Sequence, residues 1–159
     1  MRRTLLKTSE EKGFTLLLAA LVASVVIVLG AAIFSLAQKE LTLSSIGRDS
    51  QFAFYAADTG AECALYWDVQ HRYFAPTTPS VTPTCDGETL VMSGHSPTLP
   101  YTVTFRFEPN GYCVDVAVEK SLGPTGATVT IIRADGFSTA CSLLEVSPRT
   151  LQRSVELAF

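Results

Sequence analysis

Residues 14–37 read FTLLLAALVASVVIVLGAAIFSLA and carry no charged side chain. A helix of about 20 residues, rising about 1.5 Å per residue, is long enough to cross the hydrocarbon core of a bilayer. Only three hydroxyl-bearing residues interrupt the apolar run, namely Thr15, Ser24 and Ser35. Residues 14–37 are therefore predicted to form a transmembrane helix.

The preceding segment, residues 1–13, reads MRRTLLKTSEEKG and has a net charge of +2. Segments rich in Lys and Arg stay on the cytoplasmic side of a membrane span. A secretory signal would be cleaved after a shorter apolar stretch, whereas this one passes without a turn signal into Gln38-Lys39-Glu40-Leu41. We therefore interpret residues 1–13 as a cytoplasmic leader peptide.

The charge of the remaining chain argues against one class of partner. Since the whole chain carries −3 and the leader +2, residues 14–159 carry −5, and they contain no basic patch interleaved with aromatic residues. Proteins that bind nucleic acid present a basic surface. No nucleic-acid partner is expected.

Residues 38–70 contain no proline and predict an amphipathic continuation of the helix. Apolar or small residues recur at spacings of three, four and seven, at Ile46, Ala53, Ala57, Ala61 and Ala64 or Leu65. Gly47 and Gly60 each weaken a helix by roughly 1 kcal/mol relative to alanine, so bends are expected there. Residues 71–100 hold five of the eight prolines and are interpreted as a connecting loop, with one short strand at residues 90–92.

Residues 101–159 predict an antiparallel β-domain. Apolar and polar residues alternate over 101–107 and 114–118, and Pro109-Asn110-Gly111 supplies a turn between them. Further strands are expected at 127–135 and at 154–159, with Val155, Leu157 and Phe159 on one face. The predicted fold class is α+β, with a long N-terminal helix packed against an antiparallel sheet of three or four strands.

The four cysteines, Cys63, Cys85, Cys113 and Cys141, all follow the apolar segment and are therefore placed outside the cytoplasm. An even number of cysteines in a small exported domain favours disulfides. Free buried thiols or a zinc site are the alternatives, although no pair has the CxxC spacing of structural zinc sites. Three pairings are open; we favour Cys63 with Cys85, and Cys113 with Cys141.

The sequence Lys12-Gly13-Phe14-Thr15-Leu16-Leu17 lies between the leader and the apolar helix. At these residues the chain resembles the type IV prepilin family, whose leaders end in glycine followed by phenylalanine. The resemblance implies cleavage between Gly13 and Phe14 by a prepilin peptidase, and then N-methylation of Phe14. Glycine allows the backbone to lie extended in a protease cleft.

One position departs from the family pattern. Major pilins have glutamate at the fifth residue of the mature chain, where this chain has Leu18. The chain therefore resembles minor pilins of the PilX type, or a tip subunit. The resemblance implies a filament subunit that starts as a single-pass inner-membrane precursor with an extracytoplasmic head and reaches a cell-surface pilus or pseudopilus. Its implied partners are the membrane, other pilin subunits, the prepilin peptidase and the pilus assembly platform.

Two other functions remain open. The chain is alternatively a pseudopilin of a type II secretion or DNA-uptake system, or an unprocessed, signal-anchored binding module outside the cytoplasm. An enzyme is not expected, because the sequence has no GxSxG, Walker or HExxH motif. No cofactor or metal is expected either, and His71 and His95 are interpreted as surface residues.

Overall fold

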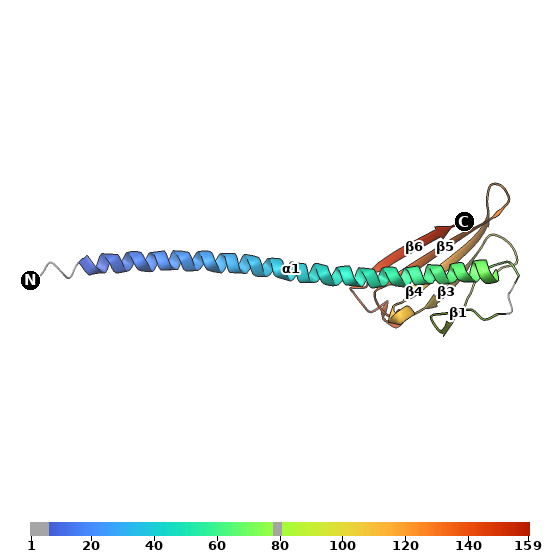
Figure 1. Ribbon diagram of the computed structural model, residues 1–159, viewed down its shortest axis with the longest axis horizontal. Helices are drawn as coiled ribbons and strands as arrows, with labels where there is room; N and C mark the ends of the chain where they lie inside the picture. Colours follow the sequence, from blue (N-terminus) through green and yellow to red (C-terminus); the bar gives the residue numbers. More distant parts are fainter. Residues whose placement is uncertain (1–6, 78–80) are drawn as a thin grey trace, which may run out of the picture. The chain divides into compact units, whose positions relative to one another are not determined.

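The computed structural model describes residues 7–77 and 81–159, with side chains from residue 13 onward. It is an α+β protein, as predicted, with one long helix and a four-stranded antiparallel sheet (Figure 1). The elements are α1 (Lys7–His71), β1 (Thr84–Cys85), β2 (Glu88–Thr89), β3 (Tyr101–Phe107), η1 (Pro109–Gly111), β4 (Val114–Leu122), β5 (Thr128–Phe137), η2 (Cys141–Leu143) and β6 (Gln152–Ala158).

The chain forms two compact units, Met1–Ser45 and Ile46–Phe159, and α1 contributes residues to both. Part of the predicted leader, residues 1–6, lies outside the described residues. The rest of it, residues 7–13, is helical and belongs to α1. We call the second unit, Ile46–Phe159, the head.

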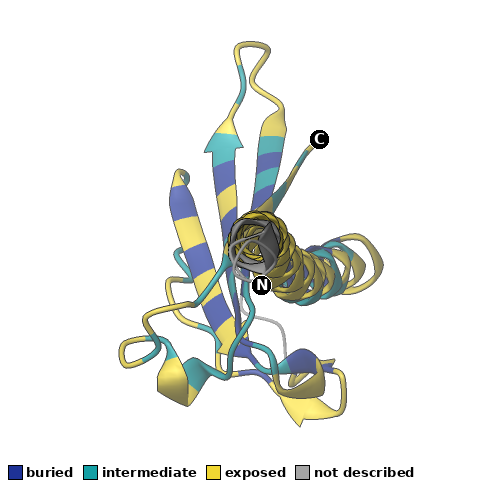
Figure 2. Cartoon of the chain, turned by 90° about the vertical axis from the view of Figure 1, so that its left-hand side faces the viewer, coloured by how far each residue is buried: buried dark blue, intermediate teal, exposed yellow. Residues whose placement is uncertain are grey.

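The sheet of the head has the strand order β3-β4-β5-β6, so every neighbour in space is a neighbour in sequence. Its pairs are antiparallel, with Val103 opposite Val118, and Val118 opposite Ile132. The alternation predicted for β3 is present: Tyr101, Val103, Phe105 and Phe107 are buried and the residues between them exposed. The same banding runs along the neighbouring strands in Figure 2. One face of the sheet is therefore apolar and needs a cover.

That cover is the C-terminal part of α1. Ala53, Ala57, Ala61 and Ala64 are fully buried, which confirms the predicted helix face, although Ile46 remains exposed. The core includes Trp67, Phe74, Val114, Val116 and Ile132. Small residues on the helix bring its backbone close to the sheet.

Gly60 serves this close approach, and α1 continues through it. A Cβ on Gly60 would lie 2.7 Å from a methyl group of Val114 and 2.9 Å from one of Val116. Gly136 on β5 is the counterpart, since a Cβ there would lie 2.1 Å from the carbonyl oxygen of Ala53. The helix continues through both Gly47 and Gly60.

The connecting loop contains a small hairpin that the sequence prediction misplaced. The predicted strand at residues 90–92 is wrong; β1 and β2 pair instead around Asp86-Gly87, both with positive φ. An Asp-Gly pair with positive φ at both residues is a preferred two-residue hairpin turn. Leu90 is buried, and its N–H donates to the carbonyl of Pro83.

The last strand is also shifted relative to its prediction. β6 begins at Gln152 and ends at Ala158. Val155 and Leu157 pack against the core, but Phe159 is 52% exposed. Phe159 lies beyond the end of the strand, where its backbone still pairs with Thr130.

Candidate assembly helix and processing site

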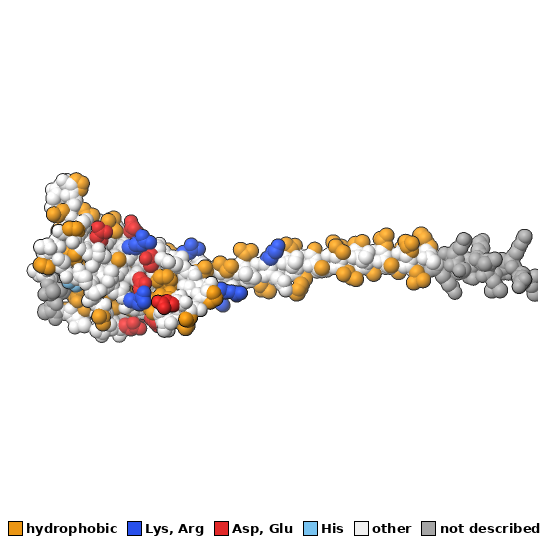
Figure 3. Space-filling view, turned by 180° about the vertical axis from the view of Figure 1, so that it is seen from behind, with side chains coloured by type: hydrophobic (Ala, Val, Ile, Leu, Met, Phe, Trp, Pro, Cys, Tyr) orange, Lys and Arg blue, Asp and Glu red, His pale blue; other side chains and the backbone are white. Residues whose placement is uncertain are grey.

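The most conspicuous surface of the chain is the apolar N-terminal part of α1. Every residue from Phe14 to Ala37 is exposed. Its most apolar 18-residue window has a mean hydropathy of 2.9, and none of that window is buried within the structure. In Figure 3 hydrophobic side chains cover this described stretch, while acidic and basic side chains gather on the head. By its length and composition this stretch is a candidate membrane span.

The hydroxyl groups of this helix have partners within the helix. Ser24 Oγ donates to the carbonyl of Leu21 at 2.8 Å, and Ser35 Oγ donates to that of Ala32 at 2.8 Å. In lipid, an unsatisfied polar group costs several kcal/mol. These bonds therefore make the two serines compatible with a bilayer.

Small residues provide places where another helix can approach. Apart from the neighbouring helix backbone, no atom of the described residues lies within 4 Å of a Cβ built on Gly30. Close packing of membrane helices uses such small residues. Such residues of the apolar segment include Ala19, Ala20, Ala23, Gly30, Ala31 and Ala32.

The predicted processing site lies inside α1. Gly13 and Phe14 are both helical and exposed, and Phe14 is 67% exposed. A Cβ on Gly13 would meet no described atom within 4 Å. A protease that binds its substrate extended must therefore unwind the first turns of α1, which lie at the end of the helix where fraying is easiest.

Two disulfides brace the head, with the pairing favoured from the sequence. Cys63 is bonded to Cys85, with a Cα–Cα distance of 6.1 Å. This bond fixes the β1 hairpin to α1, and Trp67 Nε1 reinforces it by donating to the carbonyl of Thr84 at 3.0 Å. The proline-rich loop is thus attached to the helix at two neighbouring points.

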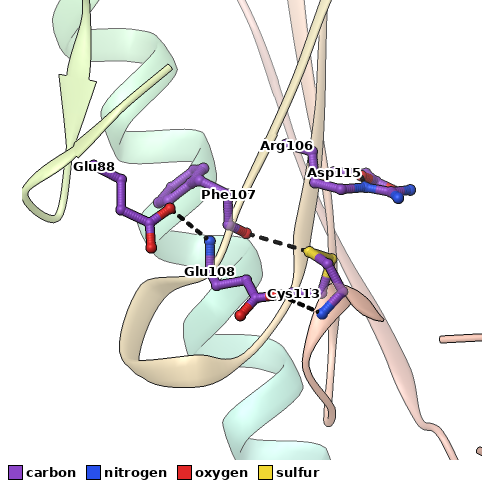
Figure 4. The surroundings of a disulfide bond; sticks show 7 residues. Glu88, Arg106, Phe107, Glu108, Cys113 and Asp115 are labelled. Atoms are coloured by element: carbon purple, nitrogen blue, oxygen red, sulfur yellow. Dashed lines mark hydrogen bonds and ion pairs between the residues drawn. A yellow bond between two sulfur atoms is a disulfide. The ribbon is translucent and has the colours of Figure 1, made fainter. Parts of the chain in front are cut away.

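The second disulfide joins Cys113 and Cys141, with a Cα–Cα distance of 4.6 Å. The backbone N–H of Cys141 donates to Glu108 Oε1 at 2.7 Å, and the N–H of Glu108 donates to Glu88 Oε2 at 3.4 Å (Figure 4). The bond therefore ties the β5–β6 connection to the beginning of β4, beside the turn that follows β3.

Sequence reasoning missed a buried ion pair between α1 and the sheet. Lys120 Nζ donates to both oxygens of Asp68, at 2.6 and 2.7 Å, and to Thr130 Oγ1 at 2.7 Å. Both charged side chains are more than nine-tenths buried. The signal was present, because Lys120 continues the buried alternation of Val114, Val116 and Val118 on β4.

Next to this pair lies Tyr101, whose hydroxyl donates to the carbonyl of Phe74. Burial raises the pKa of Tyr101, and the negative charge of Asp68 raises it further. The phenol is therefore held neutral as a hydrogen-bond donor. It joins the start of β3 to the chain just after α1.

Aromatic residues at and just after the end of α1 form part of the core. Trp67 and Phe74 are buried, and Tyr73 packs against both rings. His95 is half-buried beside Tyr73 and Phe74, so describing it as a surface residue was wrong; its Nε2 lies 3.0 Å from the carbonyl oxygen of Tyr73. His71 is exposed.

Across residues 7–77 and 81–159, no group of three or more His, Cys, Asp or Glu side chains is arranged to hold a metal ion. With the cysteines joined as disulfides, a zinc site built from them is ruled out for the oxidised chain.

Comparison with protein-family models, curated proteins and solved structures finds no match. The resemblance at residues 12–17 therefore stays a prediction. Independently of that resemblance, the structure has an exposed apolar helix of transmembrane length and a head braced by two disulfides.

Proposed function

We propose that this chain is a structural subunit of a type IV pilus-like filament, in the role of a minor or tip pilin. Its precursor is inserted in the inner membrane through residues 14–37 and is processed after Gly13. The apolar helix first resides in lipid and then packs among the helices of neighbouring subunits. Partners are other pilin subunits, the prepilin peptidase and the assembly platform.

This proposal is best supported by the difference in exposure between the two parts of α1. Its first part is apolar and exposed on all sides, and its last part is buried against the sheet through Ala53, Ala57, Ala61 and Ala64. A helix whose first part is apolar and exposed, and whose last part is packed on a sheet, can contribute that first part to a filament core of packed helices.

Leu18 supports the minor or tip role. It occupies the position of the glutamate that major pilins use, and its side chain is 52% exposed. A carboxylate in lipid is costly unless it is paired, and in a filament its partner is the amine of a neighbouring subunit. A subunit with leucine at this position cannot make that pair, which suits a place at the end of a filament better than a repeated one.

The first test is the intact mass of the membrane-bound protein, expressed with and without a prepilin peptidase. The expected product begins at Phe14 and requires the peptidase. Gly13→Val should abolish cleavage. Gly30→Val is the matched control, because Gly30 is a second exposed glycine of α1 with no described atom near its Cβ position, and this variant should still be cut.

An uncut chain, or a cut beyond Ala37, would contradict the pilin proposal and leave an anchored binding module. A second measurement addresses the role within a filament. Quantitative mass spectrometry of sheared filaments should find this chain in far fewer copies than the main subunit. Finding it as the dominant subunit would contradict the minor or tip role.

A further inference from the structure

The two outer strands of the sheet differ in what covers their free edges. β3 and β6 are the end strands of the order β3-β4-β5-β6 (Figure 1), so each has one edge that pairs with no other strand of the sheet. The backbone groups of such an edge are a template for pairing with another chain, and natural proteins cover, shorten or interrupt it. In this head the edge of β3 is covered and the edge of β6 is open.

The connecting loop covers the edge of β3. The N–H of Ser93 donates to the carbonyl of Thr104 at 3.0 Å, and the N–H of Thr104 donates back at 2.9 Å. The next residue, Gly94, lies so near the strand that a Cβ there would be 2.1 Å from the carbonyl oxygen of Thr102. A further strand therefore finds the pairing positions of β3 already occupied.

The ladder between β5 and β6 fixes which backbone groups of β6 face outward. Phe159 and Thr130 exchange both backbone bonds, at 2.9 and 3.0 Å, and the N–H of Ser138 donates to the carbonyl of Leu151 at 2.9 Å. Hydrogen-bonded pairs alternate along an antiparallel ladder, so the odd-numbered residues of β6 direct their N–H and C=O groups toward β5. The even-numbered residues direct theirs away from the sheet, and these are Gln152, Ser154, Glu156 and Ala158.

This outward row is long and unprotected. In the described part of the chain, no group bonds to the outward N–H and C=O groups of β6, and all four of their residues are exposed. The strand contains no proline, and its register with β5 is unbroken over all of its 7 residues. Its one charged side chain on the α1 side, Arg153, donates to Ser50 Oγ. The open edge of β6 can therefore accept another strand.

The side chains of β6 specify what kind of strand would fit. Val155 and Leu157 are half-buried on the side of the sheet that α1 covers, so an added strand needs apolar residues at alternate positions to cover the rest of them. On the other side Glu156 is exposed, and its charged neighbours on β5 are Arg133 and Asp135. These three side chains include one more acid than base, which favours a basic residue opposite Glu156.

A second copy of this chain does not supply that pattern. If two β6 strands paired antiparallel over the whole of Gln152–Ala158, Glu156 would lie opposite Ser154 and Leu157 opposite Arg153. Neither the basic nor the apolar partner is then present. The edge of β3 in a second copy is covered by its own connecting loop. The pattern is therefore that of a strand from a different protein.

We propose that the open edge of β6 binds an extended segment of another protein, which adds to the sheet as an antiparallel strand. Apolar side chains at alternate positions of that segment pack beside Val155 and Leu157, and a basic residue lies opposite Glu156. The inference goes beyond the proposed function and concerns the head alone, since strand addition at β6 requires neither membrane insertion nor processing.

The test uses the full chain in detergent micelles and, as the probe, the synthetic peptide Thr-Val-Lys-Val-Thr-Glu-Thr. Paired antiparallel over the whole strand, this peptide places valines opposite Val155 and Leu157 and lysine opposite Glu156. Amide hydrogen exchange is followed residue by residue by NMR. The outward amides of Ser154, Glu156 and Ala158 should exchange several-fold more slowly with the peptide, whereas the alternate amides, already bonded to β5, should change little. The same peptide N-methylated at its threonines and lysine is the control, and it should protect none of them.

Ser154→Pro removes one outward N–H while leaving the ladder with β5 intact, because an edge strand tolerates proline where its N–H faces solvent. The matched control is Ser154→Ala, which loses the same hydroxyl and its bond to Asp135 but keeps the N–H. Ser154→Pro should lose the peptide's protection of Glu156 and Ala158, and Ser154→Ala should retain it. Slow exchange of the alternate amides in both variants shows that β6 still pairs with β5.

A second variant tests the side-chain pattern without altering the backbone. Glu156→Lys should weaken binding of the probe several-fold, and a peptide with glutamate in place of its lysine should restore it. Equal binding of both peptides by Glu156→Lys would overturn the proposed pattern.

Unchanged exchange of the outward amides in the wild type, or equal protection by the N-methylated peptide, would overturn strand addition. Protection of these amides that rises with protein concentration in the absence of peptide would show that a second copy occupies the edge, and would overturn the proposed partner. Each of these failures would leave cleavage after Gly13 and filament assembly untouched.

Discussion

Lys120 has the environment least expected for its residue type. It occupies an inward position of β4, where its neighbours in the alternation are valines. Burying an ammonium group is costly unless a charge partner and further hydrogen bonds compensate for it. Asp68 and Thr130 together supply three acceptor oxygens. The pair therefore links one position on α1 to one on the sheet and disfavours other registers between them.

Replacing only one member of this pair should be strongly destabilising. Lys120→Met leaves the carboxylate of Asp68 buried without a cation, at a cost of about 3–5 kcal/mol. The double variant Lys120→Met/Asp68→Leu should recover most of that loss. The measurement is denaturant unfolding in detergent micelles, followed by the fluorescence of Trp67, the single tryptophan of the chain.

Arg106→Met is the matched control for Lys120→Met. Arg106 and Asp115 form an ion pair on the exposed face of the sheet, where such pairs contribute about 0–1 kcal/mol. If Arg106→Met and Lys120→Met lowered the free energy of unfolding equally, the larger effect expected for a buried ion pair would be contradicted.

Tyr101 should make the head sensitive to alkaline pH. Its pKa in the folded state is raised above the ordinary value of 10.0, so folding favours the neutral phenol. This contribution to stability is fully present below about pH 10 and is lost as pH rises from there through the folded pKa. Tyr101→Phe should lose about 1 kcal/mol at neutral pH and should depend less on pH above 10. Parallel slopes for both proteins would contradict this prediction.

The helix α1 covers the apolar face of the sheet. Its close contact with the sheet depends on glycines, which have no side chain, at the points of closest approach. At Gly136 the helix backbone itself is the neighbour, since a Cβ would lie 2.4 Å from the amide nitrogen of Ala57. A side chain at Gly136 would therefore push the helix away from the sheet or distort one of the two backbones.

Gly136→Ala should lower the stability of the head by about 1–3 kcal/mol, the usual cost of overpacking a core. Gly47→Ala is the control. Gly47 is a helical glycine with no described atom near its Cβ position, so alanine there should stabilise the helix by about 0.5–1 kcal/mol. Thermal unfolding of both variants in the same detergent compares them, and a neutral Gly136→Ala would show that the helix can move away from the sheet.

At the scale of the whole molecule, the two compact units depend on different forces. The head relies on a small core and two disulfides, which close loops with sequence separations of 22 and 28 residues. The first unit exposes its apolar residues 14–37 and, under the proposed function, depends on lipid or on neighbouring subunits. The two should therefore fail under different conditions.

Removal of the disulfides should destabilise the head while leaving the membrane association of residues 14–37 intact. Replacing all four cysteines by serine removes about 2–4 kcal/mol of stability for each bond, and the head should become sensitive to protease. Membrane association through residues 14–37 should persist, as measured by retention in the membrane pellet after alkaline extraction. Loss of both properties together would contradict the independence of the two units.

Sequence alone determined those features that depend on local pattern. Apolar residues over 14–37 predict a membrane-length helix, and the period of two over residues 101–107 predicts β3, because each pattern repeats with the period of its element. The cysteine pairing was favoured by a similarly local argument, with Cys63 near the end of the helix and Cys85 in the loop that follows. The Asp86-Gly87 turn is a local signal of the same kind, although the strand was predicted at residues 90–92 instead.

Tertiary structure alone decided the features that need two distant segments. The bond between Lys120 and Asp68 joins residues 52 positions apart. The need for glycine at positions 60 and 136 arises only from the packing of α1 on the sheet. The same holds for β6, whose place beside Ser50 follows from a bond between Arg153 and Ser50 across 103 positions. Periodicity reports which face of an element is buried. It carries no information on which atoms of another element will meet that face, because those contacts depend on how the elements pack in space.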